Sequence, residues 1–96
     1  MKKYENAYIL KGSLTEEQAK MEIAEITKCF DKVKIFENKE ALNGYQGLKK
    51  LAYTVRKETT GYYYITYFEG TDKEVKDIEN NLRLNDNVLK FITIEI

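Results

Sequence analysis

The sequence predicts one α+β domain, spanning residues 1–96, with elements in the order β-α-β-β-α-β. Two segments begin with a capping box and continue as an apolar stripe at helical spacing. Four other segments are rich in β-branched and aromatic residues and are bounded by turn-forming residues. A chain of 96 residues suffices for one hydrophobic core, and its 43% hydrophobic and 33% charged residues are typical of a folded domain.

The first strand is predicted over Lys3–Lys11, and both of its alternating faces carry apolar groups, which is typical of a central strand. Thr15 and Gln18 then form a capping box, and the helix that follows is expected to end near Asp31. The core-facing stripe of this helix has spacings of four, three and four, and consists of Ala19, Ile23, Ile26 and Phe30.

The middle of the chain predicts two further strands. Val33 starts the first of them, which the region Leu42–Leu48 interrupts as a loop or bulge; a separate extra hairpin is the alternative. This strand resumes over Leu48–Arg56. Thr59–Gly61 is expected to turn the chain into the next strand, Tyr62–Glu69, which is almost entirely β-branched or aromatic.

The last part of the chain predicts a second helix and a final strand. Thr71 and Glu74 form a capping box, and the apolar stripe behind them consists of Val75, Ile78 and Leu82. A turn at 85–87 leads into the strand Val88–Ile96. Right-handed crossovers give a four-stranded antiparallel sheet in spatial order 4-1-3-2 with both helices on one face, which is the ferredoxin-like fold.

Composition excludes several classes of function. The chain has no histidine, and Ser13 is its only serine, so no serine–histidine or cysteine–histidine nucleophile can be assembled. Cys29 is the only cysteine and is expected to act as a small buried hydrophobe. No apolar run approaches the ~20 residues of a membrane span, and no signal segment follows Lys2 and Lys3. We therefore expect a cytoplasmic protein without membrane contact, metal or cofactor.

The formal net charge is zero, from sixteen Lys and Arg and sixteen Asp and Glu, but the charges are unevenly distributed. The two predicted helices are acidic, whereas residues 44–61 are basic. Basic residues at one end of a sheet are what contact with several phosphates requires. We expect such a positive rim, to which these residues contribute: Lys2, Lys3, Lys49, Lys50, Arg56 and Lys57.

Aromatic residues suggest a second contact surface. Helices cover only one face of the predicted sheet, yet both faces of Tyr62–Glu69 are apolar, so large rings should reach the open face. Such a patch usually marks a partner surface. Tyr62 and Tyr64, together with Phe91 of the last strand, are the candidates for partner contact, while the sequence leaves open which sheet face meets the partner and whether Tyr62 or Tyr63 is buried.

Four segments of the chain resemble the family of ribosomal protein six of the bacterial small subunit. They are Lys2–Glu5 (KKYE), Gly47–Val55 (GLKKLAYTV), Gly61–Tyr63 (GYY) and Leu82–Lys90 (LRLNDNVLK). The Leu-Ala-Tyr block with its basic neighbours is the most specific. Thr54 stands where proline is frequent in the family, and many members have arginine where this chain has lysine, so bidentate phosphate contacts would become point-charge contacts.

The resemblance implies a ferredoxin-like structural protein that resides in the small ribosomal subunit and catalyses nothing. It also implies pairing with ribosomal protein eighteen and joint binding to the central domain of the small-subunit ribosomal RNA. By position, Lys2, Lys3, Lys49 and Lys50 are the candidates for RNA contact, and Arg56, Lys57 and Arg83 are further ones.

The sequence leaves rival functions open. A stand-alone RNA-recognition domain would bind single-stranded RNA through Tyr8, Tyr62 and Tyr64, and Thr60–Tyr67 partly matches the longer ribonucleoprotein motif. An acylphosphatase-like hydrolase on this fold needs a glycine-rich phosphate loop with an arginine, which Leu10–Ser13 lacks. A small-ligand regulatory dimer would use a pocket that sequence does not reveal. We expect no enzyme activity and no small-molecule substrate.

Overall fold

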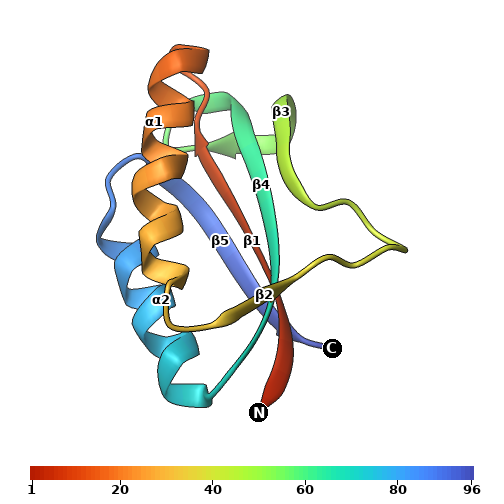
Figure 1. Cartoon of the computed structure of the whole chain (residues 1–96). Helices are drawn as coiled ribbons and strands as arrows, with labels where there is room; N and C mark the ends of the chain where they lie inside the picture. Colours follow the sequence, from red (N-terminus) through yellow and green to blue (C-terminus); the bar gives the residue numbers. More distant parts are fainter.

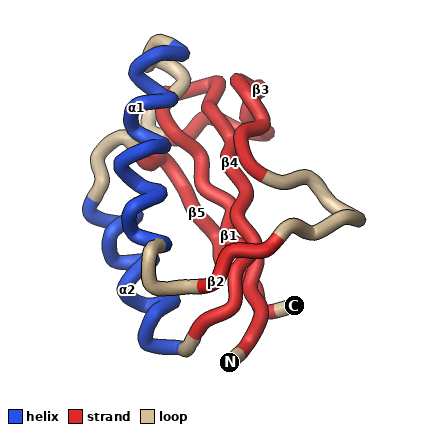
Figure 2. Tube along the Cα trace, viewed as in Figure 1, coloured by secondary structure: helices blue, strands red, loops and turns tan.

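The computed structural model describes residues Met1–Ile96 and has a sheet in one layer and two helices in the other (Figure 1). The sheet is antiparallel throughout and consists of β1 (Lys2–Lys11), β2 (Lys34–Phe36), β3 (Gly44–Val55), β4 (Glu58–Gly70) and β5 (Val88–Glu95). Helix α1 (Glu16–Thr27), the 3-10 turn η1 (Lys28–Phe30) and helix α2 (Asp72–Leu84) all lie on one side of the sheet (Figure 2). No helix is both long and apolar enough to span a membrane.

The strand order confirms the ferredoxin-like topology. Neighbouring strands follow the order β2-β4-β1-β5, and β3 pairs with the same edge of β4 as β2 does. β2 pairs with Tyr67–Glu69, whereas β3 pairs with residues of β4 between Glu58 and Ile65. β2 and β3 are therefore two pieces of the second strand in the predicted order 4-1-3-2. Residues 37–43 form the loop between them, so the interruption lies earlier than the predicted Leu42–Leu48, and the alternative of an extra hairpin is wrong. Residues 44–48 already belong to β3, where the register shifts between Tyr45 and Gly47.

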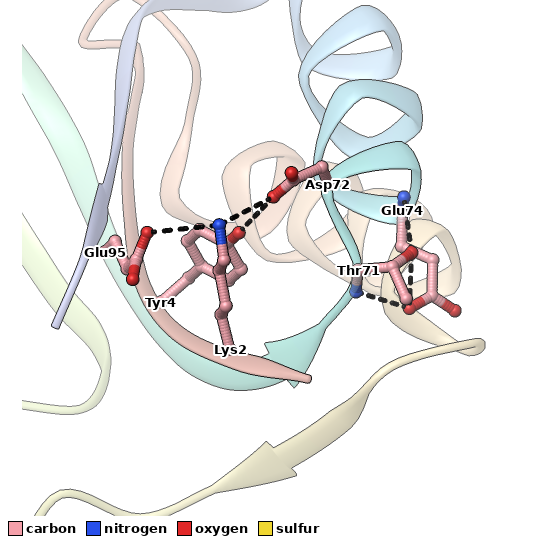
Figure 3. A network of polar contacts seen from close by, with 6 residues as sticks. All are labelled: Lys2, Tyr4, Thr71, Asp72, Glu74 and Glu95. Atoms are coloured by element: carbon pink, nitrogen blue, oxygen red, sulfur yellow. Dashed lines mark hydrogen bonds and ion pairs between the residues drawn. The ribbon is translucent and has the colours of Figure 1, made fainter.

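Both predicted capping boxes are present. The hydroxyl oxygen of Thr15 accepts a hydrogen bond of 3.1 Å from the Gln18 amide, and the Gln18 side chain accepts one of 2.9 Å from the Thr15 amide. Thr71 and Glu74 make the same exchange at 3.2 and 2.9 Å (Figure 3). These bonds satisfy N–H groups that have no partner inside the helix, which fixes where each helix begins.

The core lies between the helices and the sheet face formed by even-numbered residues of β1 and β4. Tyr8, Leu10 and Phe68 are at most 1% exposed. Phe68 packs edge-on against Phe30, with ring centroids 5.7 Å apart, and stacks on Tyr4 at 5.5 Å. Every residue of the two predicted helical stripes points into this layer, although Val75 is only half-buried. Cys29 is also half-buried and packs against the core.

The turn that joins β3 to β4 lies earlier than predicted. Val55 pairs with Glu58, so Arg56 and Lys57 form a two-residue turn with φ of +45° and +67°. Thr59–Gly61 is not a turn but part of β4. Two residues with positive φ are the mark of a type I′ hairpin turn, for which Asn-Gly is the usual signal. Because Arg56 and Lys57 occupy the turn in place of Asn-Gly, the sequence does not indicate it.

Candidate nucleic-acid interface

A basic surface occupies one end of the sheet. Lys49 on β3 lies opposite Gly61 of β4, which in turn lies opposite Lys11 at the end of β1. Lys50 and the turn residues Arg56 and Lys57 continue beyond Lys49 at the same end, and all four are exposed. Lys11 was not among the sequence candidates. Its only signal would have been the register of β1 against β4, which the sequence does not give. We refer to Lys11, Lys49, Lys50, Arg56 and Lys57 as the basic end.

Lys2 and Lys3 do not belong to the basic end, so the single positive rim expected from the sequence is wrong. Lys2 lies opposite Gly70, at the other end of β1 and β4 from Lys11. A strand rises about 3.3 Å per residue, which puts the two ends about 30 Å apart. Lys3 is 4.0 Å from the carboxylate of Glu69, and its ammonium lies 5.3 Å from the centroid of the Phe36 ring.

Lys2 is held by acidic groups of its own chain. Its ammonium lies 3.6 Å from Asp72 and 3.7 Å from Glu95 (Figure 3). Asp72 also accepts a hydrogen bond of 2.8 Å from the Tyr4 hydroxyl. This bond and the positive charge of Lys2 lower the pKa of Asp72, and the same bond raises the pKa of Tyr4 to about 12. The local surroundings of Lys2 therefore offer a phosphate little net positive charge.

The end of β3 crosses the face of the sheet that the helices leave open. The hydroxyl oxygen of Tyr53 accepts a hydrogen bond of 2.7 Å from the Lys90 ammonium on β5, although β4 and β1 lie between β3 and β5 in the sheet. This contact raises the pKa of Lys90. Leu51, in the same part of β3, is buried. At the tip, the Arg56 guanidinium donates a hydrogen bond to the main-chain carbonyl of Val88.

The rest of the open sheet face carries an apolar patch. Register places Ala7 between Ile65 and Ile92, and Ile9 beside Tyr63. The patch is most exposed along β5, where Ile92 is 56% and Ile94 is 47% exposed. We call the following residues the open-face patch: Ala7, Ile9, Tyr63, Ile65, Ile92 and Ile94.

The three aromatic residues predicted to contact a partner lie on the other face, so this assignment is wrong in placement. Tyr62 is only 5% exposed, and its hydroxyl donates a hydrogen bond of 2.8 Å to the Leu14 carbonyl. Tyr64 stacks on the buried Tyr8 with centroids 5.5 Å apart. Phe91 packs against the core. With Tyr8, Tyr62 and Tyr64 turned inward, the ring set of a stand-alone RNA-recognition domain is not available for stacking on bases.

Two cationic residues flank the basic end near the start of β5. The Arg83 guanidinium, at the end of α2, lies 5.6 Å from the centroid of the Phe91 ring, and Lys90 lies on the neighbouring strand. Arg83 was predicted from the sequence, whereas Lys90 was not. Arg83, Lys90 and Arg56 all line one cavity with Asp86. The structure thus unites five of the seven predicted RNA-contact residues in one region and leaves out Lys2 and Lys3.

The fold and these two surfaces define a small α+β protein with a ferredoxin-like sheet, a basic end and an uncovered apolar face. Comparison with known proteins identifies its family. The family model described as Ribosomal protein S6 matches residues 3–95. The chain therefore belongs to the ribosomal protein S6 family, which confirms the resemblance seen in the sequence.

The relatives agree with this assignment. The chain is 35% identical to the small ribosomal subunit protein bS6 of Sulfurovum sp. (strain NBC37-1) over 92 residues, which are 96% of this chain and 70% of that protein. It is 34% identical to the protein of the same name from Helicobacter pylori (strain Shi470) over 97 residues, covering 99% of this chain and 65% of that protein. The chain thus spans about two thirds of the length of these relatives.

The fold is shared with a solved structure. The crystal structure of the 30S ribosomal protein S6 from Thermotoga maritima superposes with a TM-score of 0.86 at 21% sequence identity. The match covers 99% of this chain and 87% of that one. At this identity the likeness establishes the ferredoxin-like architecture alone.

Proposed function

We propose that this protein is a structural component of the small ribosomal subunit. In this proposal it binds the central domain of the small-subunit ribosomal RNA through its basic end, jointly with ribosomal protein eighteen. The observation that carries the proposal is membership of the ribosomal protein S6 family over residues 3–95. The separation of a cationic surface from an apolar one supports it, because each surface suits a different partner.

The basic end supplies the electrostatic part of the proposed contact. Neither Lys49 nor Lys50 has an ion pair within the chain, and Lys49 lies 5.8 Å from the centroid of the Tyr63 ring. Each lysine that neutralises an RNA phosphate releases a condensed counterion, which favours binding. A chain of zero net charge has few such contacts to offer, so its RNA affinity alone should be low. A basic protein partner on the same RNA would supply the remainder.

The open-face patch supplies the proposed contact with ribosomal protein eighteen. Apolar residues at the centre of an interface, with charged residues at its rim, are typical of stable protein contacts. Ile92 and Ile94 are the most exposed members of the patch, while Lys90 and Glu95 lie beside them on the same strand. Burial of such isoleucines removes apolar surface from water, at about 25 cal/mol per Å².

Charge reversal tests the RNA contact. We expect a Lys49→Glu/Lys50→Glu variant to lose incorporation into small subunits and to lose the gel shift of central-domain RNA in the presence of ribosomal protein eighteen. Lys73→Glu/Lys76→Glu on α2 is the matched control, because it reverses two exposed lysines on the helical side. Unchanged incorporation of the Lys49/Lys50 variant would refute the proposed RNA contact.

A second pair of variants tests the protein contact. We expect Ile92→Asp to weaken binding to ribosomal protein eighteen in isothermal titration calorimetry, because it places a charge in the open-face patch. Leu84→Asp is the control, since Leu84 on α2 is 82% exposed and lies away from that patch. Equal binding by the two variants would exclude the patch as the contact surface. A strong RNA gel shift by this protein alone would instead favour the stand-alone RNA-binding alternative.

A further inference from the structure

We propose that the cavity between the tip of the β3–β4 hairpin and the α2–β5 connection binds a single phosphate group of an RNA strand, clamped by Arg56 and Arg83. This inference rests on the proposed function, because it names the group recognised at one point of the RNA contact. It concerns a different set of side chains from Lys49 and Lys50.

The cavity brings together cations from three separate elements. It has a volume of about 370 Å³, and its charged lining consists of Arg56, Arg83, Lys90 and Asp86. The Lys90 ammonium is bonded to the Tyr53 hydroxyl, which does not line the cavity, so the two guanidinium groups against Asp86 leave a net charge of +1. Phe91, Val88, Leu82 and Leu89 form the apolar part of the lining. Low-dielectric walls around a net positive charge strengthen its attraction for an anion.

The chemistry of the two arginines selects a phosphate. Arg56 and Arg83 are the only arginines of the chain, whose other fourteen basic residues are all lysine, and both line this one cavity. A guanidinium presents a rigid fork of N–H groups that matches two phosphate oxygens at once, whereas an ammonium acts as a point charge. Their shared location is therefore where this chain retains bidentate recognition.

Contacts within the chain hold both guanidinium groups in place. One Arg83 nitrogen donates a hydrogen bond of 2.8 Å to Asn80, and the group lies over the Phe91 ring. One Arg56 nitrogen donates to the Val88 carbonyl. Each of these hydrogen bonds uses a single nitrogen of its guanidinium group. Groups that are ordered before binding lose less conformational entropy when a ligand arrives.

Backbone strain at the hairpin tip is a further, independent sign of function. Arg56 and Lys57 both have positive φ, which disfavours residues with a Cβ by roughly 1–2 kcal/mol each. Asn-Gly would make this turn without that strain. Strained residues persist where the surroundings hold them, and they cluster at functional sites. Here the strained turn carries Arg56 across the sheet end to the cavity.

Interference with single phosphates of the RNA, combined with conservative variants of the two arginines, tests the clamp. The probe is central-domain RNA in which one phosphate at a time is replaced by a neutral methylphosphonate, bound by this protein together with ribosomal protein eighteen. We expect one phosphate position at which the methylphosphonate lowers the affinity of the wild-type protein about tenfold. At that position the Arg83→Lys and Arg56→Lys proteins should bind the modified RNA as well as they bind unmodified RNA. Both variants should bind unmodified RNA about tenfold more weakly than wild type.

Inorganic phosphate provides the second arm, which distinguishes an RNA phosphate from a free anion. We expect millimolar inorganic phosphate to leave the Nε–H NMR signals of Arg56 and Arg83 in the free protein nearly unshifted. Binding of the RNA should shift both signals. Equal shifts with inorganic phosphate alone would overturn the assignment to RNA. Unchanged RNA affinity of both variants, with Lys49→Glu/Lys50→Glu still defective, would overturn the clamp and leave the proposed function standing. If Arg83→Lys, Arg56→Lys and Lys49→Glu/Lys50→Glu all bound RNA as wild type does, both the clamp and the proposed function would be overturned.

Discussion

The hydroxyl of Tyr4 donates a hydrogen bond of 2.8 Å to Asp72 Oδ1, which joins the first strand to the first turn of the second helix across 68 residues of sequence. The Lys2 ammonium adds an ion pair to the same carboxylate at 3.6 Å (Figure 3). This contact explains why a conspicuous N-terminal lysine serves the fold of its own chain. It also gives the folding stability a defined dependence on pH.

Substitution of Asp72 tests that dependence. The pKa of Asp72 is lower in the folded protein than its ordinary value of 3.8, so the carboxylate contributes stability above pH 3.8. This contribution is lost as the pH falls through the lowered folded pKa. We expect Asp72→Asn to reduce the free energy of unfolding at pH 7, and the difference from wild type to shrink below pH 3.8. Urea denaturation at a series of pH values measures it, with Asp77→Asn as the control on the same helix.

Two tyrosine hydroxyls of the core should respond oppositely to removal. The Tyr8 hydroxyl is buried and has no hydrogen-bond partner, and burial raises its pKa far above the ordinary value. We expect Tyr8→Phe to stabilise the protein by about 1 kcal/mol, because an unsatisfied buried polar group is removed. Tyr62→Phe removes a hydroxyl bonded to the Leu14 carbonyl and should destabilise by about 1 kcal/mol. A loss of stability in both variants would contradict this account.

Gly61 lies where the strands approach too closely for a side chain. A Cβ at this position would be 2.4 Å from Ile9 Cγ2 and 2.9 Å from the Leu10 carbonyl oxygen. We expect Gly61→Ala to destabilise the fold by at least about 1–3 kcal/mol, measured by thermal and urea denaturation. The double variant Ile9→Ala/Gly61→Ala should show a favourable coupling energy, because one of the two clashes is gone. Additive effects would mean that the Ile9 contact is not the cause.

The strained hairpin turn predicts a stabilising substitution. Lys57 has φ of +67° and makes no hydrogen bond through its side chain, so Lys57→Gly should raise the free energy of unfolding by about 1 kcal/mol. Lys57→Ala is the control, since alanine keeps the Cβ and should give no such gain. Chemical denaturation of the three proteins measures the effect. Similar stability of the glycine and alanine variants would show that the turn is not strained.

Local patterns predicted most of the elements correctly because local forces form them. The capping boxes at Thr15 and Thr71 are hydrogen bonds between residues three apart, so the sequence alone contains both partners. The hairpin turn was missed because its conformation is imposed by strand pairing on residues without turn propensity. The position of Lys2 was predicted wrongly for a related reason. Its contacts, Asp72 of α2 and Glu95 of β5, are far away in the sequence, so no local pattern predicts them.

The sequence by itself determined the number and order of the elements, their ferredoxin-like arrangement and the protein family. These follow from hydrophobic periodicity, capping and short motifs, all of which involve residues that are close together in the sequence. Only the tertiary structure decided which rings of β4 are covered and where the charges gather. A strand that is apolar on both faces can turn either face toward the core, so alternation does not predict whether Tyr62 or Tyr63 is buried. Packing against the helices decides that Tyr62 is the buried one. The basic end likewise exists only because strand register brings Lys11, Lys49 and the hairpin tip to the same edge of the molecule.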